Sequence, residues 1–502
     1  MIECAPGESI PSLNFLSVSY LLFLPAVFAV HWAVPVRLRW ATILAASLWF
    51  VASAAPSALV PLLAAAALAW AAGLALARRP GARATKALFA FAAVAPLAAL
   101  AVFKYAGFAS ELASSAARAC GLSLHPAAAG LALPLGISFW TFTLVSYLLD
   151  VRRGTIPAER HPGRFAAYVL FFPKLVAGPI ERAGRLLPQL AAPAPFSCER
   201  ASLGMRQIAL GLIRKAVVAD YLASFTDAAF ATPGRFNSSA LFLAAILYSL
   251  QIYNDFAGYS DIAIGSARLL GFDLADNFRA PVFARSLKDF WARWHISLST
   301  WFRDYVYIPL GGSRRGAWRT RLNLLATFVL SGLWHGASLT FVAWGAIHGL
   351  AQIAEKALFP LDGRRDAPPP RHPRLAATAA ALRWAATFLV VTAAWIFFRA
   401  DTLPDAWAYL AKAARAWHSP VAGMARAFRQ FAIAPGVAVR LFAPLLVLGA
   451  WDLLSLRRDP FGLVDRLPAA ARWAIHAAAV AAILYVLLPQ GQSARDFVYF
   501  RF

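Results

Sequence analysis

Long runs of apolar residues, separated by short polar segments, make up most of the chain. The length of the clear runs is close to the roughly 20 residues that a helix needs to cross a bilayer. One further run, 206–232, is interrupted by Arg214 and Lys215 and is weaker evidence for a crossing. The pattern predicts an all-α, polytopic transmembrane protein with about 10–12 membrane helices. The clear runs are 13–33, 40–55, 58–77, 87–107, 131–149, 238–258, 379–398, 438–456 and 471–489.

The polar segments divide the chain into four predicted parts. Residues 1–150 have few polar side chains within their apolar runs and are expected to form an N-terminal transmembrane scaffold. Residues 151–358 contain the broken and aromatic-rich segments and form the expected core. The Pro-rich stretch at 359–378 is expected to be a flexible cytoplasmic linker. Residues 379–502 are expected to add a C-terminal set of transmembrane helices.

Two segments of the core depart from the pattern of a straight membrane helix. Residues 171–182 are interrupted by Pro173, Gly178 and Pro179. Irregular backbone at membrane depth is tolerated only where protein or a water-filled cavity surrounds it. We interpret this stretch as re-entrant or interfacial, with an ordinary cytoplasmic loop as the alternative. Residues 283–305 are rich in Trp, Arg and Lys, which suit the headgroup level, and are predicted to form one or two interfacial helices.

Composition strengthens the membrane prediction, and charge adds an orientation. Of the 502 residues, 60% are hydrophobic, and the mean hydropathy is +0.59, whereas soluble domains average about 45–50% apolar residues. The net charge of +24 comes from 48 Lys and Arg against 24 acids, spread over short loops rather than on one nucleic-acid-binding patch. Basic loops are typical of the cytoplasmic side. Their alternation places the N-terminus outside the cytoplasm and residues 265–320 inside, while the basic loop 399–437 falls outside.

Two histidines stand out as candidates for proton transfer, because imidazole titrates nearest neutrality. His335 follows Trp334 within an apolar run and is flanked by Gly332 and Gly336, which would loosen the helix and allow close approach of another molecule. His335 is predicted to be a general base at a membrane cavity, or else a histidine bonded within a helix bundle. His295 is either functional or a surface histidine in an aromatic belt.

A polar face is predicted on the helix that contains residues 251–261. Asn254 and Asp261 are seven residues apart, two helical turns, and so share a face; Asp255 lies beside the first of them. Such a face argues for a lined cavity or a tightly bonded network. By contrast, His348 is predicted to be structural, because it follows His335 by 13 residues, about 20 Å along a continuous helix.

Other chemistry finds no support in the sequence. The three cysteines have unrelated spacings, and there is no metalloprotease, phosphate-loop or dinucleotide motif. No metal and no permanently bound cofactor is therefore expected. A histidine base acting on a hydroxyl acceptor is the most economical interpretation.

Several long motifs resemble one family. The chain is similar to the membrane-bound O-acyltransferases (MBOAT), in the bacterial branch that contains alginate O-acetyltransferase and the D-alanyl transfer protein of teichoic acid. The motifs occur in order along nearly the whole chain, which makes chance similarity implausible. They cover residues 133–139, 172–182, 253–265, 290–302, 304–313, 332–336 and 497–502.

The resemblance implies a ring of helices around a central funnel, in a multi-pass protein of the bacterial inner membrane. It places His335 at the family's principal catalytic histidine and His295 at the second conserved polar position. A cytoplasmic acyl-CoA or acyl carrier protein would supply the acyl group as a thioester. A separate periplasmic, hydrolase-like protein would complete transfer to a polysaccharide. The residues expected to bind substrates are Asn254, Asp255, Asp261, Trp291, Arg293 and Trp334.

The expected function is O-acetylation of an extracytoplasmic polysaccharide resembling alginate, with acetyl-CoA or a carrier thioester as donor. In this interpretation His335 removes the proton of an acceptor hydroxyl. His295 orients donor or acceptor, or stabilises the oxyanion. Peptidoglycan or another cell-wall polymer is an alternative acceptor. A transporter or flippase without covalent chemistry, or a platform that recruits a secreted partner, is the alternative from another functional class.

Overall fold

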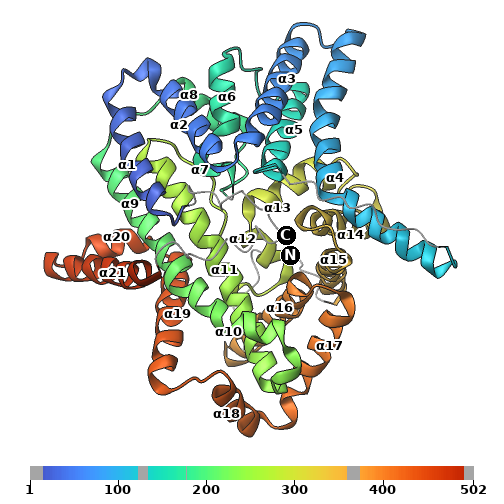
Figure 1. Ribbon diagram of the computed structural model, residues 1–502, viewed down its shortest axis with the longest axis vertical. Helices are drawn as coiled ribbons and strands as arrows, with labels where there is room; N and C mark the ends of the chain where they lie inside the picture. Colours follow the sequence, from blue (N-terminus) through green and yellow to red (C-terminus); the bar gives the residue numbers. More distant parts are fainter. Residues whose placement is uncertain (1–14, 123–133, 177, 359–372, 491–502) are drawn as a thin grey trace. The chain divides into compact units, whose positions relative to one another are not determined.

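A computed structural model describes residues 15–122, 134–176, 178–358 and 373–490. Regular structure in these ranges is helical throughout, so the all-α prediction is confirmed (Figure 1). The chain forms two compact units. Unit 1 contains the residues up to Gly211 together with Tyr259–Ala275. Unit 2 contains Leu212–Gly258 and the residues from Asp276 onward, so the predicted four-part division stays a prediction.

The helices of unit 1 arise from Ala- and Leu-rich segments whose ends are set by glycine, proline and capping side chains. Ser17 caps the first helix by accepting a hydrogen bond from the Tyr20 amide at 3.1 Å. Gly136 precedes another helix with φ of 66°, and a Cβ there would lie 2.7 Å from the Leu175 carbonyl oxygen. The elements are α1 Val18–Ala33, η1 Val36–Leu38, α2 Arg39–Ala54, η2 Pro56–Ala58, α3 Leu59–Arg78, α4 Arg83–Ala119, α5 Ile137–Arg153, α6 Pro162–Leu170, α7 Phe172–Leu175, α8 Ala183–Ala191 and α9 Cys198–Leu212.

Unit 2 carries both candidate histidines. Helix α11 (Ser238–Leu269) begins in this unit and contributes its last residues to unit 1. Helices α14 and α15 pack side by side along their lengths (Figure 1). Besides α11, the elements are η3 Ile213–Ala219, α10 Asp220–Ala231, η4 Pro233–Arg235, η5 Pro281–Phe283, α12 Leu287–Arg293, α13 Ile296–Phe302, η6 Arg303–Tyr307, α14 Gly316–His335, α15 Leu339–Leu358, α16 Pro373–Arg399, α17 Leu403–Ala413, η7 Ala414–His418, α18 Pro420–Gln430, α19 Pro435–Ser455, α20 Pro460–Asp465 and α21 Ala469–Gln490.

Six helices of the described chain are long and apolar enough to cross a membrane, which makes this a multi-pass membrane protein. The clear apolar runs at 13–33, 40–55 and 131–149 give shorter helices, α1 and α2 of 16 residues and α5 of 17. The total of about 10–12 crossings therefore stays a prediction. The six are Pro56–Arg78, Arg83–Ala119, Ser238–Leu269, Arg374–Arg399, Pro435–Ser455 and Ala469–Val486.

The charged interruption of the run 206–232 is accommodated within a continuous helical segment. Arg214 and Lys215 lie in η3, a π-helical turn between α9 and α10. Both are buried, and burial of a charge is costly unless the charge is paired. The Lys215 ammonium lies 2.8 Å from an Asp220 oxygen and 2.6 Å from an Asp255 oxygen. Arg214 pairs with Asp452 of α19.

Within the broken segment 171–182, residues 171–176 and 178–181 are buried in unit 1, Arg182 is half-buried, and residue 177 lies outside the described residues. The Phe172 amide donates to the Ser47 hydroxyl of α2 at 3.1 Å. The buried Glu181 carboxylate accepts a hydrogen bond from the Ala275 amide at 2.8 Å. These contacts fit irregular backbone surrounded by protein rather than an exposed loop.

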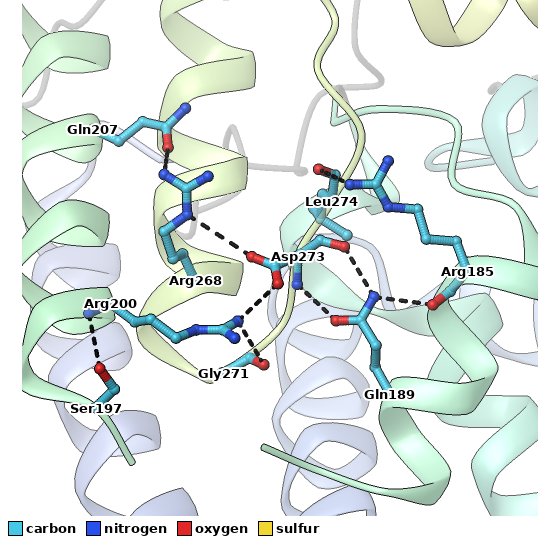
Figure 2. Close-up of polar contacts among 9 residues, drawn as sticks. All are labelled: Arg185, Gln189, Ser197, Arg200, Gln207, Arg268, Gly271, Asp273 and Leu274. Carbon is cyan, nitrogen blue, oxygen red and sulfur yellow. Dashed lines mark hydrogen bonds and ion pairs between the residues drawn. The ribbon is translucent and has the colours of Figure 1, made fainter. Parts of the chain in front are cut away.

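A polar network in unit 1 fixes the loop that follows α11 (Figure 2). The Asp273 carboxylate accepts a hydrogen bond from Arg200 of α9 at 3.0 Å. Gln189 of α8 accepts from the Asp273 amide at 2.7 Å and donates to its carbonyl at 3.0 Å. Arg185 donates to the Leu274 carbonyl at 2.8 Å. Because both its backbone and the Asp273 side chain are held, the loop has a fixed conformation within unit 1.

Candidate functional site

His335 ends α14 and lies in an aromatic enclosure. Its side chain is 5% exposed, and the chain turns at Gly336 before α15 begins. The imidazole centroid lies 4.8 Å from the ring of Trp334, 5.1 Å from Trp344 and 5.5 Å from Phe398. These rings exclude water and fix the imidazole plane, so His335 is positioned by packing.

The glycines beside His335 serve the pairing of α14 with α15. A Cβ on Gly332 would lie 2.2 Å from the carbonyl oxygen of Phe341. A Cβ on Gly336 would lie 2.0 Å from the Phe341 ring. The sequence suggested that another molecule approaches these glycines, but Phe341 of α15 occupies the space beside both. The glycines therefore allow the two helices to approach closely.

His295 occupies the break between α12 and α13 and is only 1% exposed, so a surface histidine is excluded. Its φ of 43° is in the left-handed region, which is rare for a residue other than glycine. The imidazole lies 4.6 Å from the Phe256 ring and 6.4 Å from the Trp334 ring. Trp334 therefore contacts both candidate histidines. Strained backbone of this kind concentrates at functional sites.

Asn277 fixes the tautomer of His295. Its Oδ1 accepts hydrogen bonds from the Ser297 amide at 3.4 Å and from the Ser297 hydroxyl at 2.6 Å. The same oxygen lies 3.4 Å from Nδ1 of His295, which must therefore donate. Nε2 then carries the lone pair, and it has no hydrogen-bond partner among the described residues. Burial lowers the pKa of His295, which lies outside the six candidate spans, to about 3, so the ring is neutral at physiological pH.

His348 is a third buried histidine of the same cluster. The Trp291 indole donates to its Nδ1 at 3.3 Å, and its ring lies 5.0 Å from Trp344. Trp344 also contacts His335, so one indole lies between the two histidines. The prediction that 13 residues separate them by about 20 Å was wrong, because the helix breaks at Gly336 and reverses.

The remaining predicted residues divide between the two units. In unit 2, Asn254 donates to the Leu250 carbonyl at 2.8 Å, and its Oδ1 has no partner within the described chain. The Asp255 carboxylate forms an ion pair with the Lys215 ammonium. Asp261 belongs to unit 1, where it accepts a hydrogen bond from Gln207 at 3.2 Å. A shared helix face therefore does not give Asn254 and Asp261 the same surroundings.

Among the other expected substrate-binding residues, Trp334 lies beside both candidate histidines. Trp291 instead contacts His348. The Arg293 guanidinium lies 2.7 Å from the Asp289 carboxylate, which neutralises its charge. A small apolar hollow of about 20 Å³ lies beside Trp294, the residue before His295. Within the described chain, no cluster of three or more His, Cys, Asp or Glu side chains suits a metal ion.

Sequence reasoning did not single out Asn277 or Ser297 as site residues. The Asn277 carbonyl accepts a hydrogen bond from the Ile296 amide at 2.9 Å, which holds the segment of Asn277 against that of His295 and Ser297. The sequence offers one signal for Asn277. It is a polar residue in a segment without apolar periodicity, just before the aromatic-rich stretch 283–305. The structure therefore adds a supporting layer of polar contacts behind His295.

The buried histidine–tryptophan cluster lies within the part of the chain that matches a known family. The model of MBOAT, the membrane-bound O-acyltransferase family, matches residues 159–398. Residues 159–398 of this chain are therefore assigned to this family. The six long apolar helices of the described chain agree with a membrane-bound family.

Within the family, the chain is similar to the alginate O-acetylases. It is 40% identical over 314 residues to a probable alginate O-acetylase, AlgI, of Pseudomonas aeruginosa, covering 62% of this chain and 58% of the relative. A peptidoglycan O-acetyltransferase of Helicobacter pylori is 33% identical over 55% of this chain and 56% of its own. A teichoic acid D-alanyltransferase of Bacillus subtilis is 29% identical over 43% of this chain and 57% of its own length. The chain thus spans little more than half the length of these relatives.

Proposed function

We propose that this protein is a membrane-bound O-acyltransferase that moves an acetyl group from a cytoplasmic thioester to an extracytoplasmic polysaccharide resembling alginate. The observation that carries the proposal is the pair of buried histidines on either side of Trp334, one of which has a free Nε2 lone pair within the described chain. The identity to alginate O-acetylases favours alginate as the acceptor class. The similarity to a peptidoglycan O-acetyltransferase keeps peptidoglycan as the second candidate acceptor.

In the proposed reaction, His335 takes the proton of an acceptor hydroxyl while the hydroxyl oxygen attacks the thioester carbonyl carbon. A carbon–oxygen bond forms, the carbon–sulfur bond breaks, and the thiolate leaves. The imidazolium of His335 returns its proton to that thiolate. The products are an acetyl ester and a free thiol, so atoms and protons balance. The aromatic enclosure of His335 favours this chemistry because it keeps water from hydrolysing the thioester.

His295 acts in this scheme by orienting the acceptor. Its Nδ1 proton is directed to Asn277, so a neutral His295 has no proton on Nε2 to donate to an oxyanion. Nε2 is instead an acceptor, suited to a hydroxyl of the acceptor molecule. Of the two roles expected from the sequence, orientation therefore fits the hydrogen bonding better than oxyanion stabilisation.

The donor is proposed to approach from the cytoplasmic side, with the N-terminus outside in the inner membrane. Arg285 and Lys288, at the start of α12, are exposed cations that suit the phosphates of CoA or of a carrier's prosthetic group. Arg293 suits this role less well because Asp289 neutralises it. A periplasmic hydrolase-like partner is proposed to complete transfer to the polymer.

Membrane vesicles and a doubly labelled thioester test this function. Acetyl-CoA and acetyl carrier protein, each carrying one label on the acetyl group and another on the thiol portion, are added to the cytoplasmic face. With the proposed periplasmic partner supplied on the opposite face, only the acetyl label should reach alginate, and only in vesicles that contain this protein. Transfer of the acetyl label to peptidoglycan alone would contradict the proposal that an alginate-like polysaccharide is the acceptor. Passage of the intact thioester without ester formation would indicate a transporter instead.

A further inference from the structure

A cationic cavity of unit 2 lies at the first turn of α11. It has a volume of about 330 Å³ and is built from α11, η7 and α18. Neither of its arginines forms an ion pair within the described chain, and no acidic side chain lines it. Positive charge gathered without a counter-charge attracts anions. The lining residues are Asn237, Ser238, Ser239, Arg415, His418, Ser419 and Arg426.

Hydrogen-bond donors are also concentrated there. The Asn237 side chain caps α11 by accepting from the Ala240 amide at 2.8 Å, which leaves the Ser238 and Ser239 amides without an intrahelical partner. The Ser239 side chain is only 3% exposed, lines the cavity, and forms no hydrogen bond with the described residues. Amides at a helix N-terminus, a buried hydroxyl and guanidinium groups are the donors that bind phosphate.

The cavity depends on close approach of α18 to α11. A Cβ on Gly423 would lie 2.2 Å from the Ser239 hydroxyl oxygen, so a larger residue would displace one wall. Asn237 donates to the Gly423 carbonyl at 2.9 Å and so holds the two elements together. Because glycine and asparagine fix these walls, the site is formed before any ligand binds.

The position of the cavity favours a lipid as the source of the phosphate. It adjoins the start of the candidate span Ser238–Leu269. Trp417 and Val421, next to the lining residues, are 68% and 82% exposed, and the Trp417 ring lies 5.6 Å from that of Phe242 on α11. Exposed tryptophan and aliphatic side chains beside arginine are typical of the headgroup level.

We infer that this cavity binds the phosphate group of an anionic phospholipid, a function separate from the proposed acyl transfer. The two guanidinium groups hold the phosphate oxygens, with the first amides of α11 and the Ser239 hydroxyl completing the contacts. The acyl chains lie along the exposed apolar surface at Trp417 and Val421. Bound lipid thereby ties the ends of α11 and α18 together.

Thermal unfolding of the purified full-length protein in mixed micelles tests the inference. Dioleoyl phosphatidylglycerol is compared with dioleoylglycerol, which has the same chains without the phosphate, and with inorganic phosphate. Phosphatidylglycerol is expected to raise the unfolding midpoint, and dioleoylglycerol is not. Arg415→Gln and Arg426→Gln should each require about tenfold more lipid for the same shift, because each removes a charge-assisted contact. Ser239→Ala should weaken binding less.

The matched control is Arg429→Gln, a basic residue of α18 that does not line the cavity. It should respond to the lipid as the wild type does, and all variants should keep the lipid-free midpoint. An equal shift of the unfolding midpoint in all variants would mean that the lipid acts on the protein as a whole, and it would contradict binding at this cavity. An equal shift with inorganic phosphate at the same phosphate concentration would overturn the lipid source. Stabilisation by alginate oligomers but not by the lipid would also overturn the inference.

Discussion

Gly332 is the position where α14 and α15 constrain each other most directly, and Gly332→Ala tests whether this packing positions His335. The added Cβ would lie 2.2 Å from the Phe341 carbonyl oxygen and 3.1 Å from its carbon. Restoring ordinary contact requires the helices to separate by roughly 1 Å, because the obstacle is backbone and cannot rotate away. Overpacking of this kind costs about 1–3 kcal/mol of unfolding free energy. His335 is three residues further along and would shift with α14, and a displacement of about 1 Å lowers the rate about 100-fold.

The assay measures both the unfolding midpoint of the purified protein and polymer acetylation by membranes with equal protein levels. Gly449→Ala of α19 is the matched control, because a Cβ there meets no atom within 4 Å. That substitution should raise stability by up to about 1 kcal/mol through helix propensity and leave acetylation unchanged. If Gly332→Ala matched Gly449→Ala in both measurements, the packing argument would be refuted.

Three further predictions concern buried polar groups. Asn277→Ala should lower the free energy of unfolding by about 2–4 kcal/mol in denaturant titrations, because the Ser297 amide and the His295 Nδ1–H lose their acceptor. Asn277→Asp keeps an acceptor oxygen and should retain most of the wild-type free energy of unfolding. The pKa of His295, about 3, is below its unfolded value of about 6.5, so stability should fall as the pH drops below about 6.5. His295→Gln should remove about 1.4 kcal/mol per pH unit of that slope in unfolding titrations, and an unchanged slope would contradict burial of the neutral ring. Lys215→Met should cost about 3–5 kcal/mol, measured by chemical denaturation, since Asp255 and Asp220 lose their partner; adding Asp255→Asn should recover part of the loss.

Much of the helical architecture was predictable, because apolar runs of membrane length have few alternatives to helix. The predicted span at 238–258 lies within α11, and the span at 438–456 lies within α19 except for its last residue. The run 206–232, whose two charges made it weaker evidence for a crossing, is helical but is not among the six candidate spans. Arg214 and Lys215 are neutralised by Asp452 and by acids nearer in sequence. Such pairing between distant segments leaves no local signal.

The histidines could be selected from sequence, but their surroundings could not. The contact between His295 and Asn277 spans 18 residues and depends on the left-handed backbone at His295. His348 was set aside because a continuous helix was assumed, and the extended backbone at Gly336 ends that helix. Periodicity correctly placed Asn254 and Asp261 on one face, but α11 contributes them to different units. Tertiary packing decided each of these outcomes.

The central claim is that His335 is the catalytic base. The direct measurement is the acetyl content of the secreted polymer, by proton NMR, in cells whose only copy carries His335→Gln. His476→Gln is the control, a histidine of α21 away from the aromatic enclosure. With equal amounts of both variants in the membrane, the His335 variant should show at least about 100-fold less acetyl transfer, and the control should match the wild type. Normal acetylation with His335→Gln would contradict the account.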